Sequence, residues 1–371
     1  MGPRPFPDIH SADLKQRPIE KAETIPSDWY YSDAIFAFEK EALFSKFWQL
    51  ACHENELPET GDSYMLEVAD NPLMLVRADE ETINAFYNVC KHRGGPVAVK
   101  KGTTSVLQCQ YHGWTYLLDG SLRGVPHFKK VDLFDKKDFG LEPVYHQCWE
   151  GFRFVSLNEE GPALSEVLEG ISETIAPIDL SEFQFVEKQS YQIDCNWKVY
   201  VDNFLEGYHI PIVHPELAKL LDYGEYKTDT TEWYSLQHSP FQKGDNIYKA
   251  SDGKAYYYFI FPNIMLNILP GRLQTNIIRP VSPTRTEVIF KYYYANPDDE
   301  NIIRDDIEYS DKIQDEDIEI CELVQKGLQS DAYDKGRFSV EREKGVYHFQ
   351  TILKREFANF LENHSDKYEI N

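Results

Sequence analysis

The sequence is poor in the features that mark secreted and membrane-spanning proteins. Its 371 residues include only six cysteines, which is too few for a disulfide framework in a chain of this length. Its most apolar stretch, residues 256–271, is interrupted by Pro262, Asn263 and Asn267 and is therefore typical of strands, not of a membrane span. The first ten residues lack the apolar segment of a secretory signal. We expect a cytoplasmic protein without a membrane partner.

Positive charge is also scarce. The chain has 38 Lys and Arg against 62 Asp and Glu, a formal net charge of -24. Such a balance argues against general nucleic-acid binding and against attachment to an anionic membrane surface. Aromatic residues, by contrast, are plentiful, with 22 Phe, 24 Tyr and 6 Trp. This composition predicts a folded globular protein, and the length suggests two or three domains.

Hydrophobic periodicity divides the chain into three parts. Residues 33–50 repeat apolar positions at intervals of three and four, which predicts a helix, and 1–44 form a helical N-terminal segment. Residues 45–157 contain short alternating runs broken by Gly, Pro and Asp, as expected for an all-β module. In residues 158–371, Asn196 is a predicted N-cap, 254–295 are rich in strand patterns, and an acidic helix runs from about 301 to 324, with Gly327 as its stop.

Two mixed pairs of Cys and His lie in the predicted β-module. Cys90 and His92 form a Cys-x-His pair, and Cys109 and His112 form a Cys-x-x-His pair. Two thiolates and two imidazoles suit either tetrahedral zinc or a Rieske 2Fe–2S centre, in which one iron takes both sulfurs and the other takes both imidazoles. Zinc fingers usually keep their Cys together and their His together, so the mixed pairs favour the iron–sulfur cluster.

This stretch resembles the Rieske domain of the Rieske non-heme iron oxygenases. Respiratory Rieske proteins carry an extra cysteine pair that forms a disulfide beside the cluster, whereas the corresponding positions here are Gly95 and Tyr111. No disulfide is therefore expected beside the cluster. This fits the low-potential end of the Rieske range, where electrons come from NAD(P)H through a reductase.

A second metal site is predicted further along the chain. His209 and His214 lie five residues apart, which does not suit one face of a continuous helix, but Pro211 should end the helix just after His209 and turn the chain back. Two histidines at a helix end, together with a carboxylate from elsewhere, would form the facial triad of non-heme Fe(II) oxygenases. Of the acids at 315–317, Asp317 shares a helical face with the apolar Ile313, Ile320, Cys321 and Val324, and is the predicted third ligand. Glu316 has a mixed position, and Asp315 points to water.

The segment 206–214 also resembles the D/E-x-x-H-x-x-x-x-H motif of the same family, with Glu206 at the carboxylate position. The resemblance implies that this carboxylate bridges to a Rieske histidine of a neighbouring subunit. Most relatives have Asp there, and Glu resembles the branch that oxidises carnitine and related quaternary amines. Glu206 and His209 are three apart and are expected to share a helical face; the alternative is a solvated Glu. Asp202, one turn earlier, either supports the bridge or faces solvent.

The resemblance implies an α+β protein, with an N-terminal all-β Rieske domain and a helix-grip-like catalytic domain that has an antiparallel sheet and a long C-terminal helix. It implies O2 activation at a mononuclear Fe(II), with NAD(P)H-derived electrons entering through the 2Fe–2S cluster. The chain shows no reductase or flavin domain, so a separate flavin/iron–sulfur reductase or ferredoxin is an expected partner. Electron exchange between neighbouring subunits implies a homotrimer.

The substrate is predicted less narrowly than the chemistry. A quaternary ammonium compound would find cation–π partners in aromatic side chains, for which Tyr208, Trp233, Phe259, Phe261 and the 256–258 tyrosines are candidates. The competing hypothesis is an aromatic-ring hydroxylating dioxygenase alpha subunit. A third hypothesis, from a different class, is a Rieske electron-transfer protein without catalytic iron, which would have no use for His209, His214 and Asp317.

Overall fold

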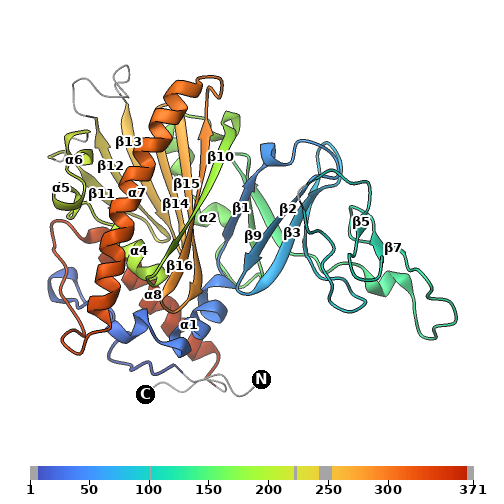
Figure 1. Cartoon of the computed structure of the whole chain (residues 1–371). Helices are drawn as coiled ribbons and strands as arrows, with labels where there is room; N and C mark the ends of the chain where they lie inside the picture. Colours follow the sequence, from blue (N-terminus) through green and yellow to red (C-terminus); the bar gives the residue numbers. More distant parts are fainter. Residues whose placement is uncertain (1–6, 101, 221–223, 242–252, 366–371) are drawn as a thin grey trace. The chain divides into compact units, whose positions relative to one another are not determined.

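The computed structural model describes residues 7–100, 102–220, 224–241 and 253–365. It divides into a larger unit, formed by 1–43 and 165–371, and a smaller unit, formed by 44–164 (Figure 1). Both units mix strands with helices or turns, and every sheet is antiparallel, so the predicted α+β class is confirmed. No helix within the described ranges is both long enough and apolar enough to cross a bilayer.

The smaller unit consists of three short sheets of three strands each. Their orders are β1-β9-β8, β2-β3-β4 and β5-β6-β7. The strands are β1 (Gln49–His53), β2 (Ser63–Val68), β3 (Asn71–Arg77), β4 (Ile83–Tyr87), β5 (Leu107–Gln108), β6 (Thr115–Tyr116), β7 (Leu122–Gly124), β8 (Tyr145–Trp149) and β9 (Phe152–Ser156). A hydrophobic core of this unit includes Cys90 and Cys109 together with Trp114 and Tyr116. The two cysteines are thus buried in this core.

The larger unit is built on a seven-stranded antiparallel sheet with the order β10-β16-β15-β14-β13-β12-β11. Alternating residues of these strands point to opposite faces, and the central strands are buried on both. The strands are β10 (Gln184–Ile193), β11 (Lys227–Thr230), β12 (Tyr234–Pro240), β13 (Lys254–Ile260), β14 (Ile264–Leu269), β15 (Arg272–Ser282) and β16 (Arg285–Tyr294).

Helices pack on this sheet. Figure 1 shows the long α7 lying along the sheet, α4 packs against both β15 and α7, and α8 packs against β11 and β12. The helices are α1 (Asp33–Glu39), α2 (Leu164–Val167), α3 (Ile171–Ile175), α4 (Trp197–Phe204), α5 (Ile210–Val213), α6 (Leu217–Leu220), α7 (Glu300–Leu328) and α8 (Lys344–Asn363). Shorter helical turns occur at Ile19–Lys21, Ser27–Tyr30, Lys40–Phe44, Glu54–Glu56, Lys136–Phe139 and Leu180–Glu182.

Two predicted helices differ from those observed in their limits or in the burial of their residues. The helix expected over 33–50 is α1 followed by a π-turn at Lys40–Phe44, because the chain enters strand β1 at Gln49. The acidic helix α7 continues through Gly327 to Leu328, so that glycine does not stop it. Val324, which was assigned to the inward stripe of α7, is 45% exposed. The predicted N-cap Asn196 is confirmed, because its side chain accepts the backbone N–H of Lys198.

A fully buried ion pair joins the N-terminal segment to helix α4. Lys198 Nζ lies 2.5 Å from Glu39 Oε1, both side chains are completely buried, and the Trp197 indole donates to Glu39 Oε2. Burial raises the pKa of Glu39 and lowers the pKa of Lys198, while the attraction between the partners opposes both shifts. Each charge therefore depends on the other to remain ionised.

Replacing Lys198 with methionine should lower the free energy of unfolding by about 3–5 kcal/mol, because it leaves Glu39 buried without its counter-ion. Denaturant unfolding followed by circular dichroism measures this change. Lys219→Met is the matched control, since Lys219 forms an exposed pair with Glu216, and its stability should stay near that of the parent protein. Equal losses in the two variants would contradict the assigned role of the buried pair.

Candidate metal sites

The chain turns sharply between the two predicted iron-binding histidines. Helix α4 ends at Phe204, and Glu206 and His209 lie in the loop that follows it, not on a shared helical face as predicted. Pro211 does not end a helix but lies in the first turn of the short helix α5, where a missing N–H costs nothing. His209 lies just before α5 and His214 lies just after it, so the two histidines flank this short helix.

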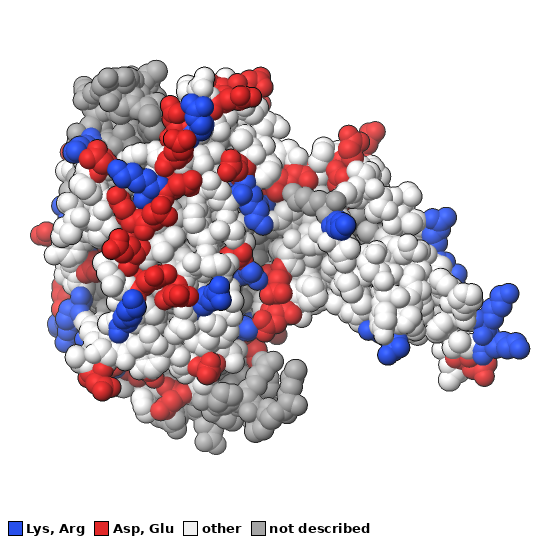
Figure 2. Space-filling model, viewed as in Figure 1, with Lys and Arg blue, Asp and Glu red and all other residues white. Residues whose placement is uncertain are grey.

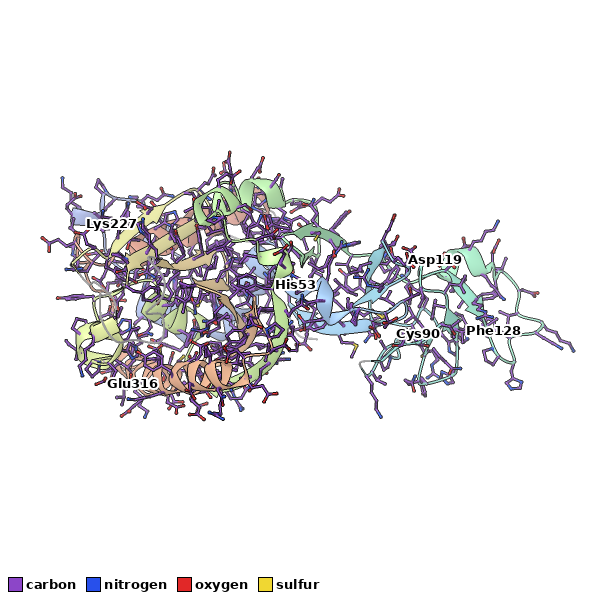
Figure 3. All side chains as sticks on the ribbon, turned by 90° about the horizontal axis from the view of Figure 1, so that it is seen from above. His53, Cys90, Asp119, Phe128, Lys227 and Glu316 are labelled. Carbon is purple, nitrogen blue, oxygen red and sulfur yellow. The ribbon has the colours of Figure 1, made fainter. Side chains whose placement is uncertain are left out.

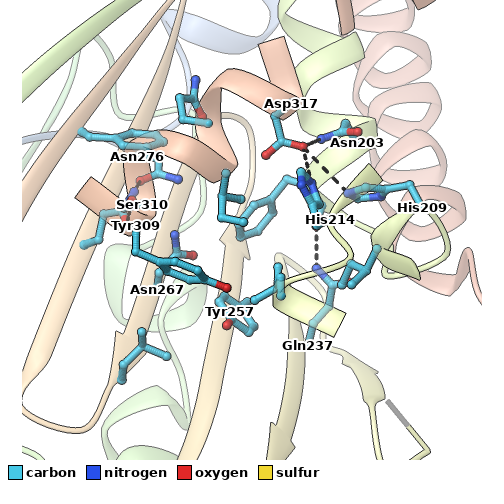
Figure 4. Close-up of a pocket in the computed structure, with 18 of the residues that line it drawn as sticks. Asn203, His209, His214, Gln237, Tyr257, Asn267, Asn276, Tyr309, Ser310 and Asp317 are labelled. Carbon is cyan, nitrogen blue, oxygen red and sulfur yellow. Dashed lines mark hydrogen bonds and ion pairs between the residues drawn. The ribbon is translucent and has the colours of Figure 1, made fainter. Parts of the chain in front are cut away.

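The two histidines of this turn meet a carboxylate from the distant helix α7 (Figure 4). The ligand atoms of His209, His214 and Asp317 all lie within 4.8 Å of one another. Asp317 Oδ1 is 2.9 Å from His214 Nε2 and 3.8 Å from His209 Nε2. Among the described residues this is the one group of three or more His, Cys, Asp or Glu side chains whose ligand atoms lie close enough to hold a single metal ion.

Each histidine is held at its other ring nitrogen by a carboxylate. Glu206 Oε1 lies 2.7 Å from His209 Nδ1, and Glu316 Oε2 lies 2.7 Å from His214 Nδ1. The Nε2 atoms are left to face Asp317. Although burial lowers the pKa of His214, its hydrogen bonds to Asp317 and Glu316 outweigh this effect and raise it. The donor set of two imidazoles and one carboxylate, each imidazole oriented from behind, fits a ferrous ion with open coordination positions.

Two supporting residues were not assigned from the sequence. Asn203 Nδ2 donates to Asp317 Oδ1 at 2.6 Å and so fixes the orientation of that carboxylate. Glu316, weighed only as an alternative ligand, instead contacts the far side of the His214 ring. The exposed position of Asp315 agrees with its predicted orientation toward water. Neither contact could be predicted from the neighbouring sequence, because each joins two segments that lie more than a hundred residues apart.

Glu206 is engaged within its own loop. Besides contacting His209 Nδ1, its carboxylate accepts the backbone N–H groups of Tyr208 and His209. These bonds satisfy N–H groups just before α5, in the manner of a helix cap, and its side chain is 14% exposed. The alternative of a fully solvated Glu206 is therefore wrong.

Asp202 is directed away from this group. Its carboxylate accepts the Tyr30 hydroxyl at 2.5 Å and the Gln350 amide at 3.1 and 3.2 Å. Burial raises the pKa of Asp202 to about 7, against the opposing effect of these hydrogen bonds. The alternative that Asp202 simply faces solvent is wrong. It also does not line the cavity described next.

A cavity of about 140 Å³ opens beside the His–His–Asp group. Its aromatic lining comes from helices α4 and α7, strands β13 and β16 and the segment before β11: Tyr200, Phe204, Tyr226, Tyr257, Phe290 and Tyr309. Apart from the two histidines, Arg272 is the one basic residue among the described residues that line it. Arg272 Nε lies 2.9 Å from Asp306 Oδ2, and both side chains are largely buried. The cavity thus offers aromatic faces and a neutralised arginine.

Of the aromatic residues predicted to contact substrate, Tyr257 lines the cavity and the others do not. Tyr208 is 56% exposed, and Trp233 lies beneath the Arg355 guanidinium. Phe259 and Phe261 pack against Phe349 of helix α8. Tyr256 and Tyr258 do not line the cavity either, so six of the seven candidates lie elsewhere, because an aromatic residue type does not show which element packs on it.

The Cys and His pairs of the smaller unit lie on two loops with matching hydrogen bonds. Cys90 N–H donates to Gly95 O at 2.8 Å and Gly94 N–H to Cys90 O at 2.9 Å, while Cys109 N–H donates to Trp114 O at 2.8 Å and Gly113 N–H to Cys109 O at 3.1 Å. Gly94 and Gly113 both have positive φ, near +70°, which glycine adopts without strain. The two loops are equivalent turns that present one cysteine and one histidine each.

The two loops bring cysteine beside cysteine and histidine beside histidine, because Cys90 and Cys109 interact with each other and the two imidazole rings are in contact. The rings of His92 and His112 lie 4.7 Å apart, both cysteines are buried, and His112 is exposed. His92 Nδ1 is buried without a hydrogen-bond partner, as expected of an atom that binds metal. Burial raises the pKa of the Cys90 thiol, so a thiolate there needs a positive partner. These features fit a 2Fe–2S cluster.

The predicted lack of a disulfide beside the cluster is confirmed. All six cysteines are free. A Cβ atom placed on Gly95 would lie 3.0 Å from Tyr111 Cβ and 3.1 Å from Cys109 Sγ. The two positions are therefore neighbours in space, as they would be if they carried a disulfide, and Gly95 leaves room beside the sulfur.

Known proteins share both parts of this chain. Residues 47–135 match the Rieske [2Fe-2S] domain, and residues 180–358 match the ring hydroxylating alpha subunit (catalytic domain). The chloroplastic choline monooxygenase of Arabidopsis thaliana is 33% identical over 352 residues, which cover 91% of this chain and 83% of that protein. The carnitine monooxygenase oxygenase subunit of Escherichia coli is 28% identical over 356 residues, covering 92% and 95%.

Solved structures agree with these matches. A quaternary ammonium Rieske monooxygenase, described with carnitine oxidation by gut microbiota and inter-subunit electron transfer, superposes with a TM-score of 0.86 at 27% identity. The match covers 92% of this chain and 99% of that one.

Proposed function

The chain belongs to the Rieske oxygenases, whose Rieske [2Fe-2S] domain is joined to a ring-hydroxylating alpha-subunit catalytic domain, and we propose that it oxidises a small quaternary ammonium compound. The predicted family, the two iron cofactors and the oxidoreductase class are confirmed by these relatives. We assign Cys90, His92, Cys109 and His112 to the cluster. His209, His214 and Asp317 are assigned to the mononuclear iron.

The two metal groups divide the chemistry between them. When bound, the cluster supplies electrons and the ferrous ion supplies open positions for O2. In a monooxygenation, O2 takes up two electrons and two protons, one oxygen atom enters the substrate, and the other leaves as water. The chain's own task is to hold the substrate carbon beside the iron and to keep the imidazoles in one orientation. Glu206 and Glu316 serve the second purpose through the two Nδ1 contacts.

The aromatic cavity beside the His–His–Asp group is the observation that carries the substrate proposal. An apolar cavity of about 150 Å³ accommodates a molecule of benzene's size, so a volume of about 140 Å³ suits a small substrate. Tyr226, Tyr257 and Tyr309 offer π faces to an ammonium group. Because Arg272 is neutralised by Asp306 and Glu206 lies at the cavity, a cationic substrate is favoured over an anionic one.

Product analysis tests this function directly. The iron-replete protein is mixed with NADH, a suitable reductase and one candidate substrate, and products are identified by mass spectrometry. Oxidation of choline or a related trimethylammonium compound at a carbon next to nitrogen is the expected result. Product must be measured beside NADH consumption, because uncoupled oxygen reduction also consumes NADH. Oxidation of aromatic hydrocarbons without any quaternary amine product would favour the alternative of a ring-hydroxylating dioxygenase.

Iron content separates an oxygenase from an electron carrier. We expect about three irons per chain, two in the cluster and one at the mononuclear site, whereas a bare Rieske carrier would hold two. The entry of NAD(P)H-derived electrons calls for a separate flavin/iron–sulfur reductase or ferredoxin, and the compartment we propose is the cytoplasm.

We further propose that the protein is a homotrimer in which Glu206 links the iron of one subunit to the cluster of the next. Inter-subunit electron transfer is described for the quaternary ammonium relative. In this chain Glu206 contacts His209 Nδ1 and two backbone N–H groups. A carboxylate has roughly four acceptor positions, which leaves room for one more donor from a neighbouring subunit. Light scattering of the purified protein measures the subunit number.

Replacing Glu206 with glutamine should slow product formation by about 10–100-fold in assays where excess Fe(II) keeps both metal sites loaded. The amide oxygen can still accept both backbone N–H groups, but the NH2 group in place of the second oxygen cannot accept a hydrogen bond from His209 Nδ1. Iron analysis, the visible spectrum of the cluster and single-turnover product yield measure the three quantities. Glu216→Gln, at an exposed site, is the control. Turnover equal to that of the control would remove the bridging role.

A further inference from the structure

Strand β15 places three polar side chains along one wall of the cavity. Arg272, Gln274 and Asn276 alternate along the strand and therefore point to the same face of the sheet. All three line the cavity, although each is at most 7% exposed. Polar groups buried this deeply need hydrogen-bond partners, either in the protein or in a bound molecule. The partners of these three side chains therefore indicate what a bound molecule has to supply.

Hydrogen bonds join the three side chains in what we call the amide row, and the row has a fixed direction. The Arg272 guanidinium donates to Gln274 Oε1, and Gln274 Nε2 donates to Asn276 Oδ1 at 2.9 Å. Because arginine can only donate, Gln274 must turn its oxygen toward Arg272 and its NH2 group toward Asn276. Asn276 must in turn present its oxygen to Gln274. The NH2 group of Asn276 is therefore the last donor of the row.

Helix α7 holds the other end of the amide row in place. Asp306 Oδ2 lies 2.9 Å from Arg272 Nε, and the Ser310 hydroxyl donates to Gln274 Oε1 at 3.2 Å. Both contacts agree with the direction of the row, since they leave an acid facing the guanidinium and an oxygen facing the hydroxyl. Figure 3 labels Glu316 further along the same helix. The helix that orients an iron-site histidine thus also anchors the amide row.

Asn276 ends the amide row at the cavity (Figure 4). Among the described residues, no acceptor is bound to its NH2 group, although its oxygen is used by Gln274. Asn267 lies directly opposite Gln274 on the neighbouring strand β14, and its Oδ1 is also buried without a hydrogen-bond partner. A ligand with only apolar groups at this wall would leave these amides unpaired, which costs free energy. The wall therefore favours a ligand that carries a polar atom.

We infer that the Asn276 NH2 group donates a hydrogen bond to an oxygen atom of the substrate, on the arm that does not carry the ammonium group. This inference rests on the proposed oxidation of a quaternary ammonium compound and makes Asn276 a residue that determines specificity. The tyrosines at 226, 257 and 309 offer their π faces to the ammonium group. A hydroxyl and a carboxylate both supply the required acceptor, whereas a simple tetraalkylammonium ion does not.

The charge of the protein limits the charge of this substrate. The chain carries a formal net charge of -24, and Figure 2 shows that red, acidic side chains predominate over helix α7. A field of this sign attracts cations and repels anions. Arg272, the basic residue of the amide row, is already paired with Asp306. The substrate is therefore expected to combine its oxygen atom with a net positive or zero charge.

Calorimetric titration of the iron-loaded, full-length protein in the absence of oxygen tests the inference by binding. Choline carries a hydroxyl, glycine betaine carries a carboxylate, and propyltrimethylammonium has a methyl group in place of the choline hydroxyl. An apolar wall would bind the last compound best, because burying an unpaired polar group costs free energy. The parent protein should instead bind choline or glycine betaine at least about 10-fold more tightly. The tighter of these two identifies the oxygen as that of a hydroxyl or of a carboxylate.

Asn276→Leu should remove this preference, because leucine fills a similar space without a donor. The ratio of the affinities for the preferred compound and for propyltrimethylammonium should fall about 10-fold, whereas general destabilisation would weaken both alike. Asn276→Ser should give the same loss, since its hydroxyl can still accept from Gln274 but its side chain is shorter. Thr275→Val is the matched control, because Thr275 is buried on the same strand and does not line the cavity. It should keep the parent ratio.

Retained binding of propyltrimethylammonium shows that the cavity is intact in each variant. Equal affinities for the three compounds in the parent protein would overturn the inference, and so would a parent ratio in both Asn276 variants. If quaternary amine products still form in these cases, the proposed function stands and only the role of Asn276 fails. Neither binding nor oxidation of any of the three compounds would reject the proposed function and the inference together.

Discussion

His209→Ala is expected to reduce substrate oxidation by more than 100-fold while the visible spectrum of the 2Fe–2S cluster stays unchanged. Losing a residue that only orients a metal ligand costs about 10–100-fold, and losing an assigned ligand should cost more. The cluster is held by a different compact unit, in which Cys90 and Cys109 belong to a separate hydrophobic core. Its spectrum should therefore not depend on His209.

Iron analysis separates this result from general unfolding. The variant should retain about two irons per chain, whereas the parent protein should hold three. His10→Ala is a suitable control because His10 is an exposed residue far in sequence from both candidate sites. Full turnover in His209→Ala, or loss of cluster absorbance with no further change, would contradict the assignment of His209 to the mononuclear iron.

The cluster loops were the part of the molecule that the sequence predicted best. Cys90 with His92 and Cys109 with His112 each lie within one tight turn, and the glycines that those turns require are adjacent in sequence. The spacing of these residues in the sequence is therefore almost enough by itself to predict both turns and the four side chains assigned to the cluster. The choice of Asp317 as a carboxylate facing the histidines also came from the helical period, and the structure brings it within reach of both.

The surroundings of the iron site could not be predicted in the same way. Tyr257 and Phe259 point to the same side of strand β13, yet Tyr257 lines the cavity, whereas Phe259 packs against Phe349 of α8, as does Phe261 just after the strand. Which helix covers each part of a sheet face is decided by tertiary packing, not by alternation. The same holds for the Arg272–Asp306 ion pair, which joins strand β15 to helix α7.

The end of helix α4 was mispredicted for a related reason. The sequence pattern continues smoothly from Trp197 to His209, and a helix over that whole range would satisfy the backbone. The structure instead ends the helix at Phe204, and the Glu206 carboxylate accepts N–H groups of the following loop. A side chain that competes for backbone donors can end a helix without a proline or a glycine cap.

Glu316→Gln is expected to weaken binding at the mononuclear site by about 10–100-fold, the usual cost of removing an outer partner of a metal-bound histidine. Glu316 Oε2 lies 2.7 Å from His214 Nδ1. A carboxylate there fixes the tautomer with Nε2 toward the metal and makes the imidazole a stronger donor. Glutamine can still accept one hydrogen bond, but it loses the negative charge that supports the ligand and can turn its NH2 toward the ring.

Titration of the iron-free mononuclear site with Fe(II) or Co(II), followed by calorimetry, measures this loss without relying on turnover. Glu319→Gln is the matched control, because Glu319 lies on the same helix and is exposed. Glu316→Asp should fall between the two, since its shorter carboxylate keeps the charge but not the reach. Because Glu316 is itself 29% exposed, its removal should leave the helix folded, so a weaker metal affinity reflects the lost contact with His214. Affinity equal to that of the Glu319 variant would show that the histidine is positioned by packing around α5 alone.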